Sequence, residues 1–258
     1  MPRIGIGIGL GLFQGGSLDA DYQAVLTYAT SLGYTLPSSG QQAKQSKLLA
    51  DLKAGSVWAK LDTFAMFAND GGSNFALIDW KRLALYTAVN SPTFTTNEGF
   101  MGNGTSSYID TNFNPATQGV NYTLNNGSRY YYHFTGAGTT VNDGIASANT
   151  YNSIRNGTST QNFINGITSL PSQFTYSTTK GVKSIHRTST TDVTLYNDKT
   201  GASRITLAAA SLTSANQLIL RRSIVYGSNE VSAYAMGASL ITENDAFVDA
   251  LNTYINSL

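Results

Sequence analysis

The stretch EGFMGNGTSSYIDTNFNP, residues 98–115, sets the pattern for most of the chain. Its start, Gly99–Met101, is typical of a short strand, and Ser107–Thr111 alternates like a second strand. Asn103-Gly104 between them tolerates positive φ, which predicts a tight turn and therefore a hairpin. Pro115 ends the ladder because it has no N–H to donate.

Similar strand-and-turn signals fill the chain on both sides of this stretch. Asn-Gly recurs at residues 126, 156 and 165, and Asp143-Gly144 adds a further predicted turn. The β-branched or aromatic runs predicted as strands are residues 64–68, 74–80, 129–134, 161–164, 182–186, 192–196, 204–207 and 217–220. Short strands at this spacing indicate a mainly β fold, a sandwich or a barrel.

Helical periodicity appears only near the two ends of the chain. Residues 19–32 repeat apolar side chains at helical spacing, with Ser17 or Asp19 as the cap and Gly33 after the end. A second helix is predicted from Ser38 or Ser39 to the residue before Gly55. A last one follows Thr242-Glu243-Asn244-Asp245, which resembles a capping box. We therefore divide the chain into a Gly-rich arm (1–16), a small helical segment (17–60) and a β domain (61–258).

The arm alternates glycine with apolar residues. Strand geometry places Ile4, Ile6, Ile8, Leu10 and Leu12 on one face and bare glycine on the other. One interpretation is an assembly element that adds a strand to a neighbouring subunit and makes a homo-oligomer. The other is a tail with little fixed structure. A phosphate-binding loop is excluded, since the third glycine of its pattern falls on Leu10 or Leu12.

Composition excludes several classes of function. Charged residues make up only 12% of the 258, against about 25% in typical proteins, and the net charge is +1. No basic excess is present for nucleic-acid binding. Cysteine is absent, which rules out disulfides and Cys-based metal sites. No stretch is apolar enough for a membrane span, no signal-peptide pattern is present, and we expect no cofactor or metal.

No catalytic residues are predicted. Glycoside hydrolysis uses paired carboxylates, and the nearest string is Glu243-x-Asp245, which helix capping explains. His133 and His186 are the only histidines. They show neither metal-ligand spacing nor a nucleophile motif, and we predict that both are hydrogen-bonded within strands.

One aromatic run is a candidate for carbohydrate binding. In Tyr130–Phe134, alternation places Tyr131 and His133 on the face opposite Tyr130 and Tyr132. One face is expected to be core, and the other is available to stack on sugar rings. Tyr151 and Arg155, near a predicted turn, offer similar side chains. The candidate glycan-binding residues are therefore Tyr131, His133, Tyr151 and Arg155, and a structural role is the alternative.

The opening stretch also resembles a known family. F-x-G-N-G-T-S-S-Y-I-D-T is similar to the opening hairpin of concanavalin A-like (laminin-G-type) jelly-roll domains. The versions it resembles occur in bacteriophage virion proteins and in phage-derived genes of Bacteroidetes-type bacteria. NFALIDW (residues 74–80) and AMGASLIT (residues 235–242), the latter followed by a helix, match the same domains in the same order. The resemblance covers roughly residues 64–258.

The resemblance implies a concanavalin A-like jelly-roll sandwich, in this chain preceded by a helical segment and closed by a C-terminal helix. It also implies a non-enzymatic bacteriophage structural protein, such as a capsid decoration, head fibre, spike or tail-associated protein. Such a protein is assembled in the host cytoplasm, bound to other virion proteins through its N-terminal part, and displays the jelly roll to host-surface glycan. The alternatives are a glycan-active enzyme of the same fold and a bacterial surface lectin, because this fold hosts many functions.

Overall fold

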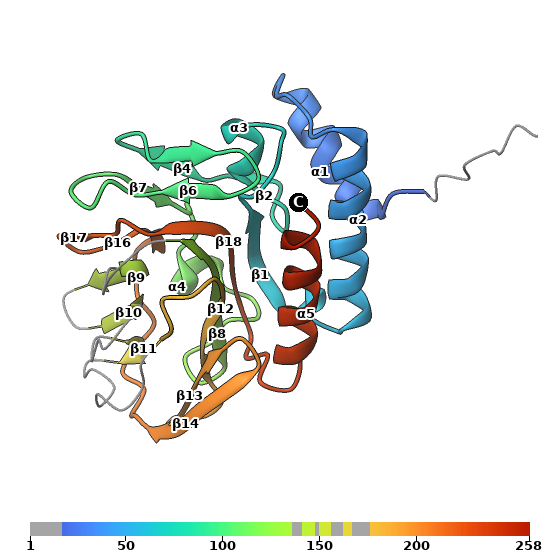
Figure 1. The fold of residues 1–258 in the computed structure, drawn as a ribbon. Coiled ribbons are helices and arrows are strands. Elements are labelled where there is room, and N and C mark those ends of the chain that lie inside the picture. Colours follow the sequence, from blue (N-terminus) through green and yellow to red (C-terminus); the bar gives the residue numbers. More distant parts are fainter. Residues whose placement is uncertain (1–16, 136–140, 148–149, 156–161, 167–175) are drawn as a thin grey trace, which may run out of the picture.

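The computed structural model describes residues 17–135, 141–147, 150–155, 162–166 and 176–258. This part of the chain forms three layers: long helices, an eight-stranded sheet and a six-stranded sheet (Figure 1). The mainly β sandwich with a C-terminal helix is therefore confirmed. The predicted arm, residues 1–16, lies outside the described residues, and its assembly role stays a prediction.

The eight-stranded sheet is the middle layer, and β18 lies near its centre. β18 pairs with β8 on one side, and with β6 and then β1 on the other. The strand order is β14-β13-β12-β8-β18-β6-β5, with β1 beside β18. Its strands are β1 (Leu61–Met66), β5 (Thr93–Thr95), β6 (Gly99–Met101), β8 (Gly127–Thr135), β12 (Gly181–Arg187), β13 (Asp192–Asn197), β14 (Thr200–Thr206) and β18 (Glu230–Gly237).

The six-stranded sheet is an outer layer, and two short ribbons accompany the sandwich. The sheet has the order β11-β10-β9-β15-β7-β4. Its strands are β4 (Thr87–Val89), β7 (Tyr108–Asp110), β9 (Val141–Ser147), β10 (Thr150–Arg155), β11 (Phe163–Gly166) and β15 (Leu218–Ile219). The ribbons are β2 (Ile78–Asp79) with β3 (Ala84–Leu85), and β16 (Arg221–Arg222) with β17 (Val225–Tyr226).

The helices begin and end where the capping residues predict. α1 (Ala20–Ser31) is capped by the Asp19 carboxylate, which accepts the Asp21 N–H at 3.0 Å. α2 (Ser39–Ala54) is capped by the Ser38 hydroxyl, and Gly33 after α1 has φ +71°. The remaining helices are α3 (Ser73–Ala76), α4 (Pro115–Gln118), α5 (Asn244–Ile255) and the 3-10 turn η1 (Trp58–Lys60).

β8 is buried on both faces because it lies in the middle layer. Tyr130 and Tyr132 face the helices, and the ring centroids of Tyr130 and Phe247 of α5 are 4.3 Å apart. Tyr131, on the opposite face, packs with Ile109 and other side chains between the two sheets. The helical segment and the β domain thus share one core.

The hairpin predicted at residues 98–115 is wrong. β6 pairs with β5 and β18 in the eight-stranded sheet, whereas β7 pairs with β4 and β15 in the six-stranded sheet. The tight turn between them exists, because the Asn103 side-chain oxygen accepts the N–H groups of Thr105, Ser106 and Ser107 at 2.8–3.0 Å. The turn therefore carries the chain from one sheet to the other.

Three other local predictions also need correction. Residues 74–80 form the end of α3 followed by β2 rather than one strand. Asp143-Gly144 lies inside β9 rather than in a turn. Glu243 stands at the N-cap of α5 without a capping hydrogen bond, and its carboxylate instead meets the Lys60 ammonium at 2.7 Å.

Candidate functional site

Two of the four predicted glycan-binding residues are buried in the described part of the structure. Tyr131 and His133 lie on β8 in the middle layer, and both side chains are fully buried. Neither ring is therefore presented to solvent for stacking on a sugar. Tyr151 and Arg155 belong to β10 of the other sheet, and their side chains lie outside the described part of the structure.

Both histidines are buried within strands, as predicted. His133 Nε2 lies 2.9 Å from the Thr178 carbonyl, and His186 Nε2 lies 3.0 Å from the Ser184 hydroxyl. Burial lowers the pKa of His133 to about 4 and the pKa of His186 to about 3. Both rings are therefore neutral at pH 7, and their contacts are structural.

A groove on the outer face of the six-stranded sheet is a better candidate. It has a volume of about 320 Å³ and is lined by Tyr108, Asp110, Ala215, Asn216, Leu218, Arg221 and Ser223. The strand pattern explains its floor: Ile109 of β7 points into the core, so Tyr108 and Asp110 point outward. The β16–β17 ribbon, which protrudes at one end of the molecule in Figure 1, supplies a wall. We call this surface the outer groove.

Arg221 is held in a fixed position in the outer groove. Its guanidinium carbon lies 4.5 Å from the Tyr108 ring centroid and 5.2 Å from that of Tyr226. Its Nε donates to the Ser223 carbonyl at 2.7 Å, within the turn of the ribbon. Two aromatic rings and one hydrogen bond thus fix the guanidinium plane, while its terminal nitrogens have no other partner among the described residues.

The groove also holds a carboxylate that Arg221 does not neutralise. The Asp110 carboxylate accepts the Asn112 N–H at 2.8 Å. No ion pair joins Asp110 to Arg221 in the described part of the chain, although both line the same groove. An acceptor and a donor of opposite charge therefore lie apart across a partly aromatic surface. A polyhydroxyl ligand is able to bridge these two groups.

The backbone around the groove explains why the ribbon lies so close to the sheet. A Cβ on Gly144 of β9 would approach the Cβ of Arg222 to 2.9 Å. Glycine at this position therefore lets β16 pack over β9. Sequence reasoning missed the groove because the short ribbon following Leu220 carries no Asn-Gly signal. The available signal was the outward alternation of Tyr108 and Asp110.

A pair of carboxyl groups also escaped the sequence analysis. Glu230 at the start of β18 is 2% exposed, and the Glu98 carboxyl lies near it. Burial, and then the nearby Glu98 charge, raise the pKa of Glu230. The two residues lie far apart in the sequence, so no local motif could reveal them. The burial of Glu230 leaves it little contact with any substrate.

Replacing Glu230 with glutamine is expected to stabilise the protein at neutral pH. A raised pKa means that the folded state binds this proton more tightly, so stability is lost as the pH rises through the folded pKa. The neutral amide removes that loss, and we expect a higher free energy of unfolding at pH 8, measured by urea unfolding. At pH 4.5 the gain should shrink, and an equal gain at both values would contradict the raised pKa.

The described part of the chain contains no group of three or more histidine and acidic side chains placed to hold a metal ion. None of its helices combines the length and the apolar character that crossing a bilayer requires.

The fold and the outer groove define a class: a two-sheet β-sandwich protein with a helical layer on one face. No protein-family model matches the sequence, and no curated protein sequence matches it either. Solved structures do match. The receptor binding domain of botulinum neurotoxin C/D mosaic serotype superposes with a TM-score of 0.50 at 9% identity, over 76% of this chain and 52% of that chain.

Two further matches carry carbohydrate in their structures. Trypanosoma rangeli sialidase in complex with sialic acid has a TM-score of 0.48 at 10% identity, over 81% of this chain and 38% of that chain. Domain 4 of AbnA, a GH43 extracellular arabinanase from Geobacillus stearothermophilus, in complex with arabinotriose, has a TM-score of 0.44 at 11% identity. The match covers 73% of this chain and 98% of that domain. The chain thus spans well under half of the sialidase. At these identities the likeness defines the fold alone, and the toxin domain is the match that supports it.

Proposed function

We propose that this chain is a non-enzymatic carbohydrate-binding β-sandwich protein and that its binding site is the outer groove. The observation that carries the proposal is the arrangement of Tyr108, Asp110 and Arg221. The ring offers an apolar face, while the carboxylate and the guanidinium lie apart in the same groove without an ion pair. Sugar rings have apolar faces and hydroxyls that both donate and accept, which matches this arrangement.

The groove has the size and the composition of a small-ligand site. About 320 Å³ is within the usual range for such sites. Leu218 and Tyr108 supply the apolar area, and Asn216 adds an amide beside the charged groups.

Binding is expected to depend on the Tyr108 ring and on the Arg221 charge. A glycan array probed with the full chain identifies a ligand, and calorimetry then measures its affinity. Tyr108→Ala and Arg221→Gln are each expected to weaken binding about tenfold, which corresponds to about 1.4 kcal/mol. Tyr108→Phe keeps the ring and should bind almost normally, and Lys199→Ala on a distant exposed ion pair serves as the control.

Two results would overturn the proposal. One is an array with no glycan bound by the folded chain. The other is glycan binding with unchanged affinity in both Tyr108→Ala and Arg221→Gln, since binding would then lie elsewhere on the molecule.

We further propose that the chain is a bacteriophage virion component that presents this groove to host-surface glycan. The support is the resemblance of residues 98–115 and 74–80 to virion jelly-roll domains. Light scattering of the full chain beside a variant that begins at Ser17 tests the assembly part of this proposal. If the full chain assembles and the shortened variant does not, the result supports a homo-oligomer built through residues 1–16. If both proteins are monomeric, the result contradicts it.

The glycan-active enzyme stays the second candidate because of the Glu98–Glu230 carboxyl pair. Paired carboxylates are what glycoside hydrolysis requires, but Glu230 is nearly inaccessible. The test is whether the chain releases reducing sugar from a glycan that it binds on the array. Release that is abolished in Glu230→Gln would show an enzyme and overturn the non-enzymatic proposal.

A further inference from the structure

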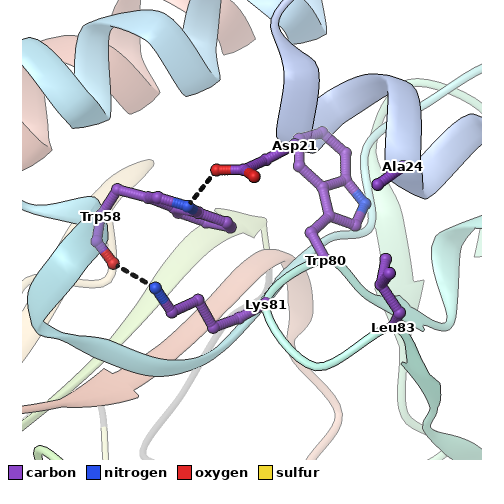
Figure 2. Close-up of a pocket in the computed structure, with 6 residues that line it drawn as sticks. All are labelled: Asp21, Ala24, Trp58, Trp80, Lys81 and Leu83. Atoms are coloured by element: carbon purple, nitrogen blue, oxygen red, sulfur yellow. Dashed lines mark hydrogen bonds between the residues drawn. The ribbon is translucent and has the colours of Figure 1, made fainter.

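A second pocket lies on the helical side of the molecule, away from the outer groove. It has a volume of about 180 Å³ and is lined by Asp21, Ala24, Trp58, Trp80, Lys81 and Leu83 (Figure 2). These residues come from α1, from η1 and from the turn between β2 and β3. The chain has two tryptophans, and both line this pocket. We call it the tryptophan pocket.

The acidic side of the tryptophan pocket is already paired. Lys53 Nζ lies 2.6 Å from Asp19 Oδ1 and 2.8 Å from Asp21 Oδ2. The indole nitrogen of Trp58 donates to the same Asp21 oxygen at 2.9 Å. Asp21 thus has a cation and a neutral donor of its own, and it does not depend on Lys81 for neutralisation.

Lys81 has no such partner. Its ammonium donates to the Trp58 carbonyl at 2.8 Å and lies 4.8 Å from the Trp58 ring centroid. No carboxylate lies within ion-pair distance of it in the part of the chain that the structure describes. Burial lowers the pKa of Lys81, while the charges of Asp21, Asp62 and Asp79 act on it in the opposite direction from beyond ion-pair distance. The pocket therefore holds a partly desolvated cation with no carboxylate in direct contact.

Trp80 adds a second unmet hydrogen-bonding group. Its side chain is 2% exposed, and its indole nitrogen has no acceptor among the described residues. Figure 2 shows this nitrogen beside Ala24, on the side of the ring where Leu83 also lies. A buried donor is normally paired, so the missing partner is a hydrogen-bond acceptor.

Leu83 lies next to this donor in an unusual backbone conformation. Its φ is +50°, in the left-handed region where glycine or asparagine is preferred, and the side chain is 37% exposed. A leucine here places an apolar, partly exposed side chain at the wall of the pocket. Strained positions of this kind cluster at ligand sites.

We propose that the tryptophan pocket binds a small ligand through its carboxylate, with the carboxylate on the Lys81 ammonium and the apolar part of the ligand against Leu83 and Trp80. The Trp80 N–H has no acceptor, and the Lys81 ammonium has two N–H groups beyond the one that donates to the Trp58 carbonyl. A carboxylate supplies acceptors together with a negative charge in direct contact with the ammonium. A volume of 180 Å³ is that of about six waters, which limits the ligand to the size of a short organic acid or one acidic sugar ring.

Intrinsic fluorescence reports on this pocket alone, because both tryptophans of the chain line it. The full chain is titrated with sodium propionate and with sodium glucuronate at constant ionic strength, with sodium chloride and glucose as reference titrants. We expect a saturable change in tryptophan emission with at least one carboxylate and none with chloride or glucose. Tighter binding of propionate indicates a free organic acid as the ligand, and tighter binding of glucuronate indicates an acidic sugar.

Lys81→Met is expected to weaken this binding at least tenfold, whereas Lys81→Arg keeps the cation and should retain it. Lys47→Met on the exposed face of α2 serves as the matched control and should bind as the unchanged protein does. If Lys81→Met does not fold, Lys81→Gln takes its place. Equal responses to propionate and chloride, or carboxylate binding unaffected by loss of the Lys81 charge, would overturn the proposal. Since Tyr108 and Arg221 are untouched, this result is independent of the outer groove.

Discussion

Replacing Asp79 with alanine is expected to destabilise the protein by about 3–5 kcal/mol, because a buried charge network loses its centre. The Asp79 side chain is fully buried. Its carboxylate accepts the Thr63 hydroxyl at 2.5 Å, the Lys81 N–H at 2.9 Å and Arg82 Nε at 2.5 Å. Alanine removes the acceptor of Arg82 Nε and of the backbone N–H groups of Phe64, Lys81 and Arg82, and urea unfolding measures the loss.

The same network connects separate parts of the sequence. The Arg82 guanidinium also donates to the carbonyls of Thr111 and Asn112, at 2.7 and 3.0 Å, directly after β7. Asp51→Ala is the matched control, since Asp51 pairs with Lys47 on an exposed helix face and should cost less than about 1 kcal/mol. A similar small loss for Asp79→Ala would show that the network adds no stability.

Acidification is expected to destabilise the protein well above the pH at which most carboxylates titrate. The unfolded chain protonates histidine near pH 6.5, whereas the folded pKa values are about 4 for His133 and about 3 for His186. The unfolded state therefore binds more protons in this window, and stability falls as the pH drops below about 6.5. With about 1.4 kcal/mol per pH unit for each ring, the loss from pH 6 to 4.5 is roughly 3–4 kcal/mol.

Histidine variants separate this effect from carboxyl titration. His133→Gln and His186→Gln should each remove about half of the pH dependence between pH 6 and 4.5, since the chain has two histidines. The Lys53 hydrogen bond lowers the pKa of Asp21, so that carboxyl contributes only at lower pH. A double variant that loses stability as steeply as the unchanged protein would contradict the assignment.

Local signals in the sequence predict the elements of this fold better than their pairing. Asp19, Ser38 and Gly33 locate the ends of α1 and α2 because capping depends on neighbouring backbone groups alone. The Asn103 turn was predicted for the same reason. Whether the strands on either side of a turn pair with each other depends on distant chain, and here Val231 and Ile219 take those places. Hence the hairpin prediction failed although its turn was correct.

The candidate site was harder to predict than the fold for a related reason. Tyr131 and His133 were assigned to a free face because a sandwich normally leaves one face of each sheet to solvent. The Tyr131 face instead packs into the core between the two sheets, and α5 covers the opposite face at Tyr130, so β8 is buried on both sides. The run Tyr130–Phe134, in which His133 is the one polar residue, was the available signal. The outer groove forms between β7 and the β16–β17 ribbon, more than a hundred residues apart, which no local pattern encodes.

Because the three layers are stacked, the two ends of the molecule carry different structures. α1 and α2 lie at one end of the molecule, and β7 and the β16–β17 ribbon lie at the other (Figure 1). The outer groove, which residues of β7 and β16 line, is therefore on the side away from the helices. A molecule anchored by its helices would therefore hold the groove at its far end, turned away from the anchor. Many copies anchored side by side through their helices would present their grooves outward in a dense array. Weak binding at each groove would then give high overall avidity through multivalency.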